Sequence, residues 1–269
     1  MRRNAKLKRM ELNGVPVTAA QLAPLGFVGF GHFTSMRITA GAVKGLTLHL
    51  DRLRRDCRDV FATELDTNRV RDLVRHALPA SDDSLVVRIT VYDPALQLAH
   101  PGAPAQPHIL VSARPALVVP QTPLTLQAAV GHRQMARIKH LGLFATQYLR
   151  AGAQRAGFDD VLLTSPEGTV SEIATSNIAF INDDGQLIWP DAEVLVGTTM
   201  RLINQARDED VLTEKVTLAD LPKFAAIVAT NAAVGVRAVS RVDDTAFPTE
   251  HALIHTLRAK YESIPPQRI

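Results

Sequence analysis

The second half of the chain contains a series of short, strongly apolar segments separated by tight-turn signals, and this pattern constrains the fold most. Pro166-Glu167-Gly168 and Asp183-Asp184-Gly185 are two of these signals. Short apolar segments bounded by Gly, Pro and Asp are typical of β-strands. The pattern predicts strands over 124–130, 160–164, 169–173, 177–182, 186–189, 211–216, 225–229 and 236–239. Because only a helix over 143–156 and another opening near Thr198 interrupt these strands, we expect a β-rich α+β fold.

The first half of the chain mixes strands with two amphipathic helices. Asn13-Gly14 predicts a hairpin turn near the start. Apolar residues recur at helical spacing over 48–61 and about 69–78, and Pro79 ends the second helix. Extended segments are predicted over 27–38, 42–46, 86–91 and 108–113.

A proline-rich stretch separates the two halves. Residues 114–123 (RPALVVPQTP) hold three prolines, and Pro cannot continue a central β-ladder. We therefore predict a small N-terminal domain over 1–116, an interdomain connector at 117–121 and a large C-terminal domain over 122–269.

The composition is that of an ordinary globular protein. Of 269 residues, 46% are hydrophobic and 21% are charged, which excludes a disordered chain. No apolar run approaches the roughly 18 residues that a membrane span needs, so no membrane association is predicted. Cys57 is the one cysteine, so an internal disulfide is impossible, and a reducing, cytoplasmic location is predicted.

The positive charge of the chain is concentrated at its start. The first nine residues hold five cations and no acidic residue, and without them the formal net charge falls from +3 to −2. A protein that binds nucleic acid distributes basic residues over a face or a groove. We therefore predict a short solvated arm and no nucleic-acid partner.

Lys139 stands out because the chain uses arginine for most of its cations. There are 23 arginines and 7 lysines, and between Lys44 and Lys215 the sequence has one lysine, Lys139. Only lysine can lose its proton near neutral pH and act as a nucleophilic amine. The alternative is a surface lysine that occurs there by chance.

Glu172 is a second candidate for chemistry. It lies in the β-rich run 169–173, directly after the Pro166-Glu167-Gly168 turn. A carboxylate at this position could form an ion pair with a ring nitrogen of a cofactor. The alternative is a strand residue that faces the solvent.

Two features could bind an anion. Gly197, Thr198 and Thr199 open a helix, where free N–H groups and the helix dipole attract negative charge; a plain helix cap is the alternative. Arg52 lies beside the apolar stripe of the 48–61 helix, and its guanidinium group suits phosphate. A salt bridge from Arg52 to Asp56, four residues later, is the alternative there.

Metal and thiol chemistry are not predicted. His251 and His255 are four residues apart, but no third ligand accompanies them in the sequence. A hydrolase elbow of the G-x-S-x-G type is absent. Cys57 falls on an apolar helix face, which favours an inert core thiol.

Taken together and in order, these residues resemble the class IV aminotransferase family, the pyridoxal-phosphate enzymes of fold type IV. The resemblance extends from about residue 10 to about residue 245 and rests on seven separate motifs. They are LNG (12–14), GFGHFTSMR (29–37), HLDRL (49–53), RIKHL (137–141), GTVSEIATSNI (168–178), LVGTT (195–199) and TNAA (230–233).

The resemblance implies a role for each candidate residue. Lys139 would hold pyridoxal 5′-phosphate as an internal aldimine and then move the Cα proton of the substrate. Glu172 would pair with the protonated pyridine nitrogen and keep the ring an electron sink. The other cofactor-binding residues implied are Arg52, Asn177, Gly197, Thr198, Thr199 and Asn231.

The resemblance also implies the activity and the assembly. We expect a two-domain enzyme, with the cofactor between the domains, that moves an amino group between an amino acid and a 2-oxo acid as a homodimer. Arg37, Arg88 and Arg133 are alternatives for the residue that binds the substrate carboxylate, and the preference for L- or D-amino acids stays open.

Departures from the family motifs keep other activities open. Phe144 stands where branched-chain enzymes tend to have a tyrosine, while Lys139-His140-Leu141 and Asn231-Ala232 look more like aminodeoxychorismate lyase, which forms 4-aminobenzoate for folate by elimination. A third alternative is a catalytically inactive binding protein with the same fold, because Phe30 and Met200 depart from the motifs.

Overall fold

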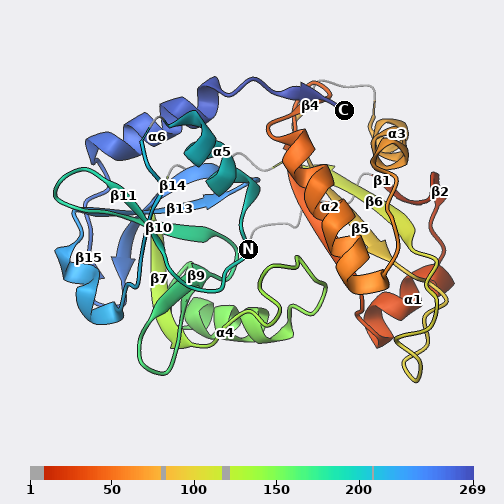
Figure 1. The fold of residues 1–269 in the computed structure, drawn as a ribbon, viewed down its shortest axis with the longest axis horizontal. Coiled ribbons are helices and arrows are strands. Elements are labelled where there is room, and N and C mark those ends of the chain that lie inside the picture. Colours follow the sequence, from red (N-terminus) through yellow and green to blue (C-terminus); the bar gives the residue numbers. More distant parts are fainter. Residues whose placement is uncertain (1–8, 80–82, 117–121, 208) are drawn as a thin grey trace. The chain divides into compact units, whose positions relative to one another are not determined.

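The structure is a computed structural model, and it describes residues 9–79, 83–116, 122–207 and 209–269. The chain forms two compact units (Figure 1). Unit 1 comprises Met1–Val118, Ile138–Gly142 and Pro265–Ile269, and unit 2 comprises Val119–Arg137 and Leu143–Ile264. The domain boundaries at 116 and 122 stay a prediction, and the connector at 117–121 and most of the basic arm lie outside the described residues.

Unit 1 is built on an antiparallel five-stranded sheet with the order β2-β1-β6-β5-β3. Its elements are β1 (Arg9–Leu12), β2 (Val15–Pro16), α1 (Ala19–Phe27), β3 (His32–Ile38), β4 (Ala42–Val43), α2 (Leu46–Phe61), α3 (Thr67–Ala77), β5 (Leu85–Tyr92), β6 (His108–Pro115) and β16 (Gln267–Arg268). The Asn13-Gly14 hairpin is as predicted, and Leu12 pairs with Val15.

Helices α2 and α3 cover one face of this sheet (Figure 1). Alternate residues of β3, β5 and β6 point into the shared core, and the apolar stripe of α2 packs on them, as the predicted periodicity requires. The members of this core include Met36, Ile38, Leu50, Leu53, Cys57, Val74, Val87, Ile89 and Val111. The buried polar residues of α2, His49, Arg52 and Asp56, are not part of this apolar core.

Unit 2 is built on a nine-stranded mixed sheet. Its elements are β7 (Leu124–Val130), α4 (Phe144–Arg155), β8 (Asp160–Thr164), β9 (Val170–Ile173), β10 (Asn177–Ile181), β11 (Leu187–Pro190), α5 (Thr198–Ala206), β12 (Leu212–Glu214), η1 (Leu218–Lys223), β13 (Ala226–Asn231), β14 (Gly235–Val242), β15 (Thr245–Ala246) and α6 (Ala252–Ser263). The strand order is β12-β11-β10-β13-β14-β7-β8-β9, with β15 paired to β14.

Three strands of unit 2, β8, β10 and β11, are buried along their whole length, which explains their largely apolar sequences. Residues Asn177–Ile181 and Asp160–Thr164 are buried at every position. Helix α4 packs on β8, while α5 packs on β13 and α6 on β14. The α+β class predicted from the turn pattern is confirmed. No helix in the described part of the chain is both long and apolar enough to cross a membrane.

Several local predictions differ from the structure. The strand expected over 42–46 ends at Val43, because Gly45 adopts a left-handed conformation with φ of 70° and α2 begins at Leu46. Helix α1 was absent from the predicted elements because Pro24 and Gly26 interrupt its pattern, although Thr18 and Gln21 form a capping box at its start. Helix α6 was also absent from them.

Candidate active site

The segment that carries Lys139 is fixed to unit 1 through its backbone. The Phe33 N–H donates to the Lys139 carbonyl at 2.9 Å, and the Leu141 N–H donates to the Gly31 carbonyl at 2.9 Å. His140 forms an antiparallel bridge with His32. The segment 138–142, which we call the lysine segment, therefore lies alongside the start of β3 like a short extra strand.

Glycine is required where the lysine segment meets β3. At Gly31, where φ is 151°, an added Cβ would lie 2.5 Å from the Val91 carbonyl oxygen and 3.0 Å from Leu141 Cδ1. Both distances are below ordinary contact, and the first is to backbone that cannot turn away. Gly31 in the GFGHFTSMR motif therefore permits the lysine segment to approach the sheet.

The Lys139 backbone also contacts helix α2. Its N–H donates to Oδ2 of Asp56 at 3.0 Å. Asp56 is fully buried, and its Oδ1 accepts from Arg55 Nη2 at 2.6 Å and from Arg55 Nε at 3.0 Å. The carboxylate considered above as a partner for Arg52 is thus bound to Arg55 and to the lysine segment.

The Lys139 amine lies near an aromatic ring that a second cation also contacts. Nζ is 5.0 Å from the centroid of the Phe33 ring, and the Arg88 guanidinium carbon is 3.6 Å from the same centroid. Burial lowers the pKa of Arg88. Arg88 Nε donates to Thr90 Oγ1 at 3.3 Å, and no carboxylate among the described residues pairs with it.

Arg52 is buried in a polar cluster of unit 1. One of its terminal nitrogens, Nη2, donates to Thr34 Oγ1 at 2.7 Å, and Thr34 Oγ1 also lies 2.7 Å from His49 Nδ1. Burial, then Arg52, then Lys139 hold the pKa of His49 well below its usual value. The imidazole is therefore neutral at physiological pH, and Arg52 presents its charge beside two neutral groups.

Glu172 is buried in unit 2, where it forms an ion pair with Arg133. Nε of Arg133 donates to Oε1 of Glu172 at 2.9 Å, and Arg133 Nη2 lies 3.5 Å from the Ala174 carbonyl oxygen. The alternative of a solvent-facing strand residue does not hold for Glu172, because this residue is only 3% exposed. A buried carboxylate that is paired with an arginine is suited to face a further cationic group.

The LVGTT turn is held in place by Asn177. Asn177 Nδ2 donates to the Leu195 carbonyl at 2.7 Å. An added Cβ at Gly197 would lie 2.1 Å from Asn177 Oδ1, although the backbone angles of Gly197 are ordinary. The Asn177 side chain therefore packs directly against the turn, and the missing side chain of Gly197 leaves the space for it.

The start of α5 has the properties of an anion site. Gly197 is its N-cap and no side chain caps the helix, so its first N–H groups lack intrahelical partners. Thr198 and Thr199 are buried, and within the described ranges Thr199 Oγ1 and Thr230 Oγ1 have no hydrogen-bond partner. Buried hydroxyls and free amides at a helix N-terminus fit a phosphate group.

The side chain of Asn231 stabilises the turn between β13 and β14. Its Nδ2 donates to Ser176 Oγ at 2.9 Å, and its Oδ1 accepts from the N–H groups of Ala233 and Val234 at 3.0 Å. The side chain thus shapes the turn between β13 and β14. The neighbouring residue Thr230 pairs with Asn177 across the sheet, which joins this turn to the LVGTT turn.

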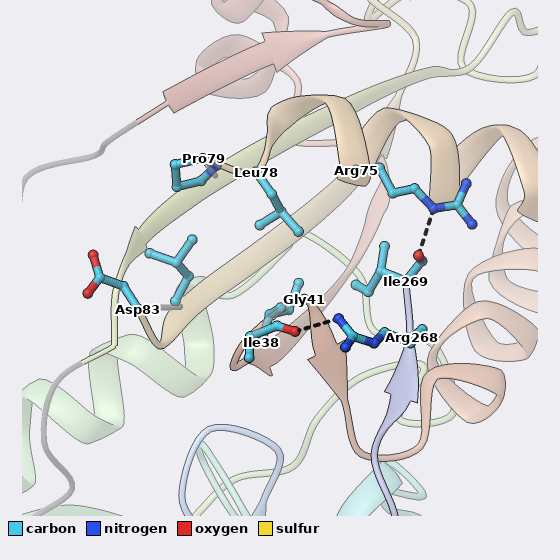
Figure 2. A pocket seen from close by; sticks show the side chains of 10 residues that line it. Ile38, Gly41, Arg75, Leu78, Pro79, Asp83, Arg268 and Ile269 are labelled. Atoms are coloured by element: carbon cyan, nitrogen blue, oxygen red, sulfur yellow. Dashed lines mark hydrogen bonds between the residues drawn. The ribbon is translucent and has the colours of Figure 1, made fainter. Parts of the chain in front are cut away.

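A separate cavity of about 610 Å³ lies in unit 1, between the end of α3 and the last residues of the chain (Figure 2). Arg75 Nε donates to the Ile269 carbonyl at 2.6 Å, and Arg268 Nη1 donates to the Ala40 carbonyl at 3.0 Å. None of the residues predicted to bind a cofactor lines this cavity. Its arginines hold residues 268 and 269 against α3 and the turn between β3 and β4.

Sequence reasoning did not single out Asp56 and Thr230 as site residues and left Arg133 among several alternatives. Asp56 and Lys139 are 83 positions apart, and Arg133 and Glu172 are 39 apart. No periodicity connects residues at such separations. A weak signal existed for Thr230 alone, because it begins the TNAA motif.

A family model and several solved structures both relate the chain to class IV aminotransferases. The family model for Amino-transferase class IV matches residues 31–242. A hypothetical aminotransferase from Mycobacterium tuberculosis, in its PLP-bound form, superposes with a TM-score of 0.82 at 18% identity, covering 96% of this chain and 98% of that one. No curated protein sequence matches the chain.

Two further solved structures are similar. The branched-chain aminotransferase from Thermoproteus uzoniensis has a TM-score of 0.81 at 19% identity, covering 96% of this chain and 94% of that one. The 4-amino-4-deoxychorismate lyase from Pseudomonas aeruginosa has a TM-score of 0.78 at 25% identity, covering 93% and 97%.

Proposed function

Since the chain belongs to the class IV aminotransferase family and has the fold type IV architecture, we propose that it is a pyridoxal 5′-phosphate-dependent aminotransferase. It would move an amino group between an amino acid and a 2-oxo acid. The observation that carries the proposal is the placement of Lys139, which is fixed through both its N–H and its carbonyl. A nucleophilic amine needs this kind of placement to react at one position.

Pyridoxal phosphate, when bound, supplies an electron sink that stabilises negative charge at the substrate Cα. Lys139 would bind its aldehyde carbon covalently through Nζ. When free, the Lys139 amine would take the proton from the substrate Cα and hold it at Nζ. Lysine can do this because its amine exchanges protons near neutral pH, whereas arginine stays protonated.

The remaining site residues would hold the cofactor. Glu172 would accept a hydrogen bond from the ring nitrogen, and Arg133 would keep its carboxylate charged and oriented. Arg52, Gly197, Thr198 and Thr199 would bind the phosphate group. Asn177 would hold the LVGTT turn, and Asn231 would support it through the adjoining turn.

Arg88 is the arginine best suited to the substrate carboxylate. Of the three arginines considered above, Arg133 is engaged by Glu172. Arg88 is partly buried, its guanidinium contacts the same Phe33 ring as the Lys139 amine, and no carboxylate in the described ranges pairs with it. A partly buried cation of this kind gains from an incoming anion.

Borohydride reduction of the protein with pyridoxal phosphate, followed by peptide mass mapping, tests the proposal. We expect one phosphopyridoxyl group on Lys139 and none in a Lys139→Arg variant, with Lys44 and Lys215 unlabelled as internal controls. Label on another lysine, or no label at all, would show that Lys139 has a different role.

A second candidate function is the lyase reaction, which releases pyruvate from aminodeoxychorismate. It is favoured by the similarity to the Pseudomonas aeruginosa enzyme, which at 25% has a higher identity than the other two structures described above. Absorption spectra of the cofactor-loaded protein, recorded with L- and D-amino acids, amines and aminodeoxychorismate, distinguish the aminotransferase from the lyase. Pyruvate released without an amino acceptor would identify a lyase, and conversion of the cofactor to its amine form by an amino acid would identify an aminotransferase.

We further propose that the enzyme is a cytoplasmic homodimer. The expectation follows from family membership and, for the location, from the single cysteine. Light scattering coupled to size-exclusion chromatography should give twice the 29.3 kDa mass of the chain. A monomer would contradict the proposed assembly. The proposed reaction is tested separately, by the borohydride experiment.

A further inference from the structure

The side chain of Asp56 connects the lysine segment to helix α2. Asp56 Oδ2 accepts the backbone N–H of Lys139 at 3.0 Å. We propose that Asp56 is a positioning residue for Lys139: its buried carboxylate determines where the backbone of the reactive lysine sits, and thereby where the amine can reach. This inference rests on the proposed function, because it assigns Asp56 a part in the reaction of Lys139.

The chemistry of Asp56 suits this task. The residue is fully buried in α2, and a buried carboxylate is stable only when it is paired and hydrogen-bonded. Arg55 pairs with it, through two hydrogen bonds that both end on Oδ1. Oδ2 thus faces the Lys139 N–H, and a hydrogen bond to an ionised acceptor is roughly twice as strong as a neutral one.

The other hydrogen bonds of the lysine segment explain why Asp56 matters. The bonds from Phe33 N–H and to the Gly31 carbonyl join backbone to backbone, on the side of the segment that follows Lys139. They fix the carbonyl of Lys139 and the amide of Leu141. The contact with Asp56 fixes the N–H of Lys139, so it completes the constraint on that residue.

Loss of the hydrogen bond from Lys139 to Asp56 would release the N–H of Lys139, while its carbonyl would stay bound to Phe33. The segment would keep its pairing with β3 because Gly31 and Phe33 are unchanged. The position of Nζ, however, follows the position of its own backbone, and small displacements of a reacting group lower rates steeply. We therefore expect slower covalent capture of the cofactor aldehyde with unchanged recognition of its phosphate.

Two variants and a matched control separate positioning from general stability. Asp56→Asn keeps the shape of the side chain but removes its charge, and Asp56→Ser serves if the first variant does not fold. Asp51→Asn is the control, because Asp51 is also on α2 and also pairs with an arginine, Arg54, at 2.7 Å, but its side chain is 44% exposed, and no hydrogen bond or ion pair joins it to the described lysine segment. Circular dichroism and urea unfolding establish which variants are folded.

Two measurements are made on the folded proteins. Hydrogen exchange of the Lys139 amide in the cofactor-free protein should be about tenfold faster in Asp56→Asn than in the parent, as expected for loss of a charge-assisted hydrogen bond. The rate of covalent capture at saturating pyridoxal phosphate should also fall about tenfold, while the half-saturating concentration stays the same. Asp51→Asn should match the parent in both measurements.

Each contrary result has one meaning. Unchanged exchange in the Asp56 variants would show that Asp56 does not anchor Lys139. Faster exchange with an unchanged capture rate would show that the anchor has no part in the reaction, and either result overturns the proposal. If the parent protein captures no pyridoxal phosphate, the proposed function fails, and the exchange measurement alone then decides whether Asp56 anchors the lysine segment.

Discussion

Arg133 and Glu172 form an ion pair whose Nε and Oε1 atoms are 2.9 Å apart, and both side chains are about 95% removed from solvent (5% and 4% exposed). Two opposite charges buried together are costly to desolvate, but each becomes much more costly if its partner is removed. The pair therefore ties the stability of unit 2 to the residue proposed to face the cofactor ring.

Replacement of Arg133 by Met should destabilise the protein strongly. The substitution leaves the Glu172 carboxylate buried without its cation, which typically costs about 3–5 kcal/mol. Urea unfolding measures this loss. Arg54→Met is the matched control, since the Arg54–Asp51 pair is nearly half exposed and should contribute less than about 1 kcal/mol. Equal effects of the two substitutions would contradict the assignment of a buried, charged pair.

Gly197→Ala should weaken phosphate binding. The new methyl group would overlap Asn177 Oδ1, so either Asn177 or the start of α5 must move. We expect at least about tenfold weaker binding of pyridoxal phosphate, consistent with loss of about one hydrogen bond, measured by equilibrium dialysis. Gly152→Ala is the control, because Gly152 lies in α4 with open space around it. That variant should bind normally and gain up to about 1 kcal/mol in stability.

Arg88→Gln should raise the KM for substrates that carry a carboxylate. Loss of a charge-assisted hydrogen bond predicts an increase of about 10- to 100-fold, with little change for amines that lack a carboxylate. Steady-state kinetics with an amino acid and its decarboxylated amine make the comparison. Arg114→Gln, on the adjacent strand β6 and exposed, should behave like the parent. A uniform decrease in rate for both substrates would point to a general structural effect instead.

His32 should make the protein less stable as the pH falls. Burial, with a smaller contribution from Arg55, lowers the pKa of His32 from 6.5 to about 3. Between these values the unfolded chain binds a proton at this residue that the folded protein does not, so the stability present above pH 6.5 is lost progressively toward pH 3. The slope is at most about 1.4 kcal/mol per pH unit.

The variant His32→Phe isolates this contribution. Both ring nitrogens of His32 lack hydrogen-bond partners among the described residues, and the ring packs near Phe61, so an aromatic replacement should fit. Urea unfolding at several pH values between 7 and 4.5 should show a loss about 2 kcal/mol smaller than in the parent. His49 is unchanged in both proteins, and identical pH profiles would mean that His32 is protonated in the folded state.

The sequence predicted those elements of the fold that local patterns determine. The ranges 124–130 and 160–164 coincide with β7 and β8, because β-branched and apolar residues bounded by turn signals leave little choice. Helix α2 follows from its apolar stripe. Helix α1 escaped prediction since its helical signals are weak next to Pro24 and Gly26, and the short strand β16 is defined by its pairing with β4.

The sequence predicted which residues belong to the candidate site, but not which residues they bind. Burial of Glu172 and the orphaned hydroxyl of Thr199 agree with a polar binding site, while their roles stay predictions. The partners that hold these residues, Asp56 for Lys139 and Arg133 for Glu172, lie far away in the sequence. Such pairs arise from the packing of whole elements, which no local pattern encodes.

The composition of unit 1 from three separate stretches affects how the chain can fold as it is synthesised. The sheet and helices of its first stretch are synthesised early, but the lysine segment follows later, and β16, which pairs with β4, comes only after unit 2. A growing chain can therefore form the scaffold of unit 1 during translation, yet that unit is completed only after unit 2 has been synthesised.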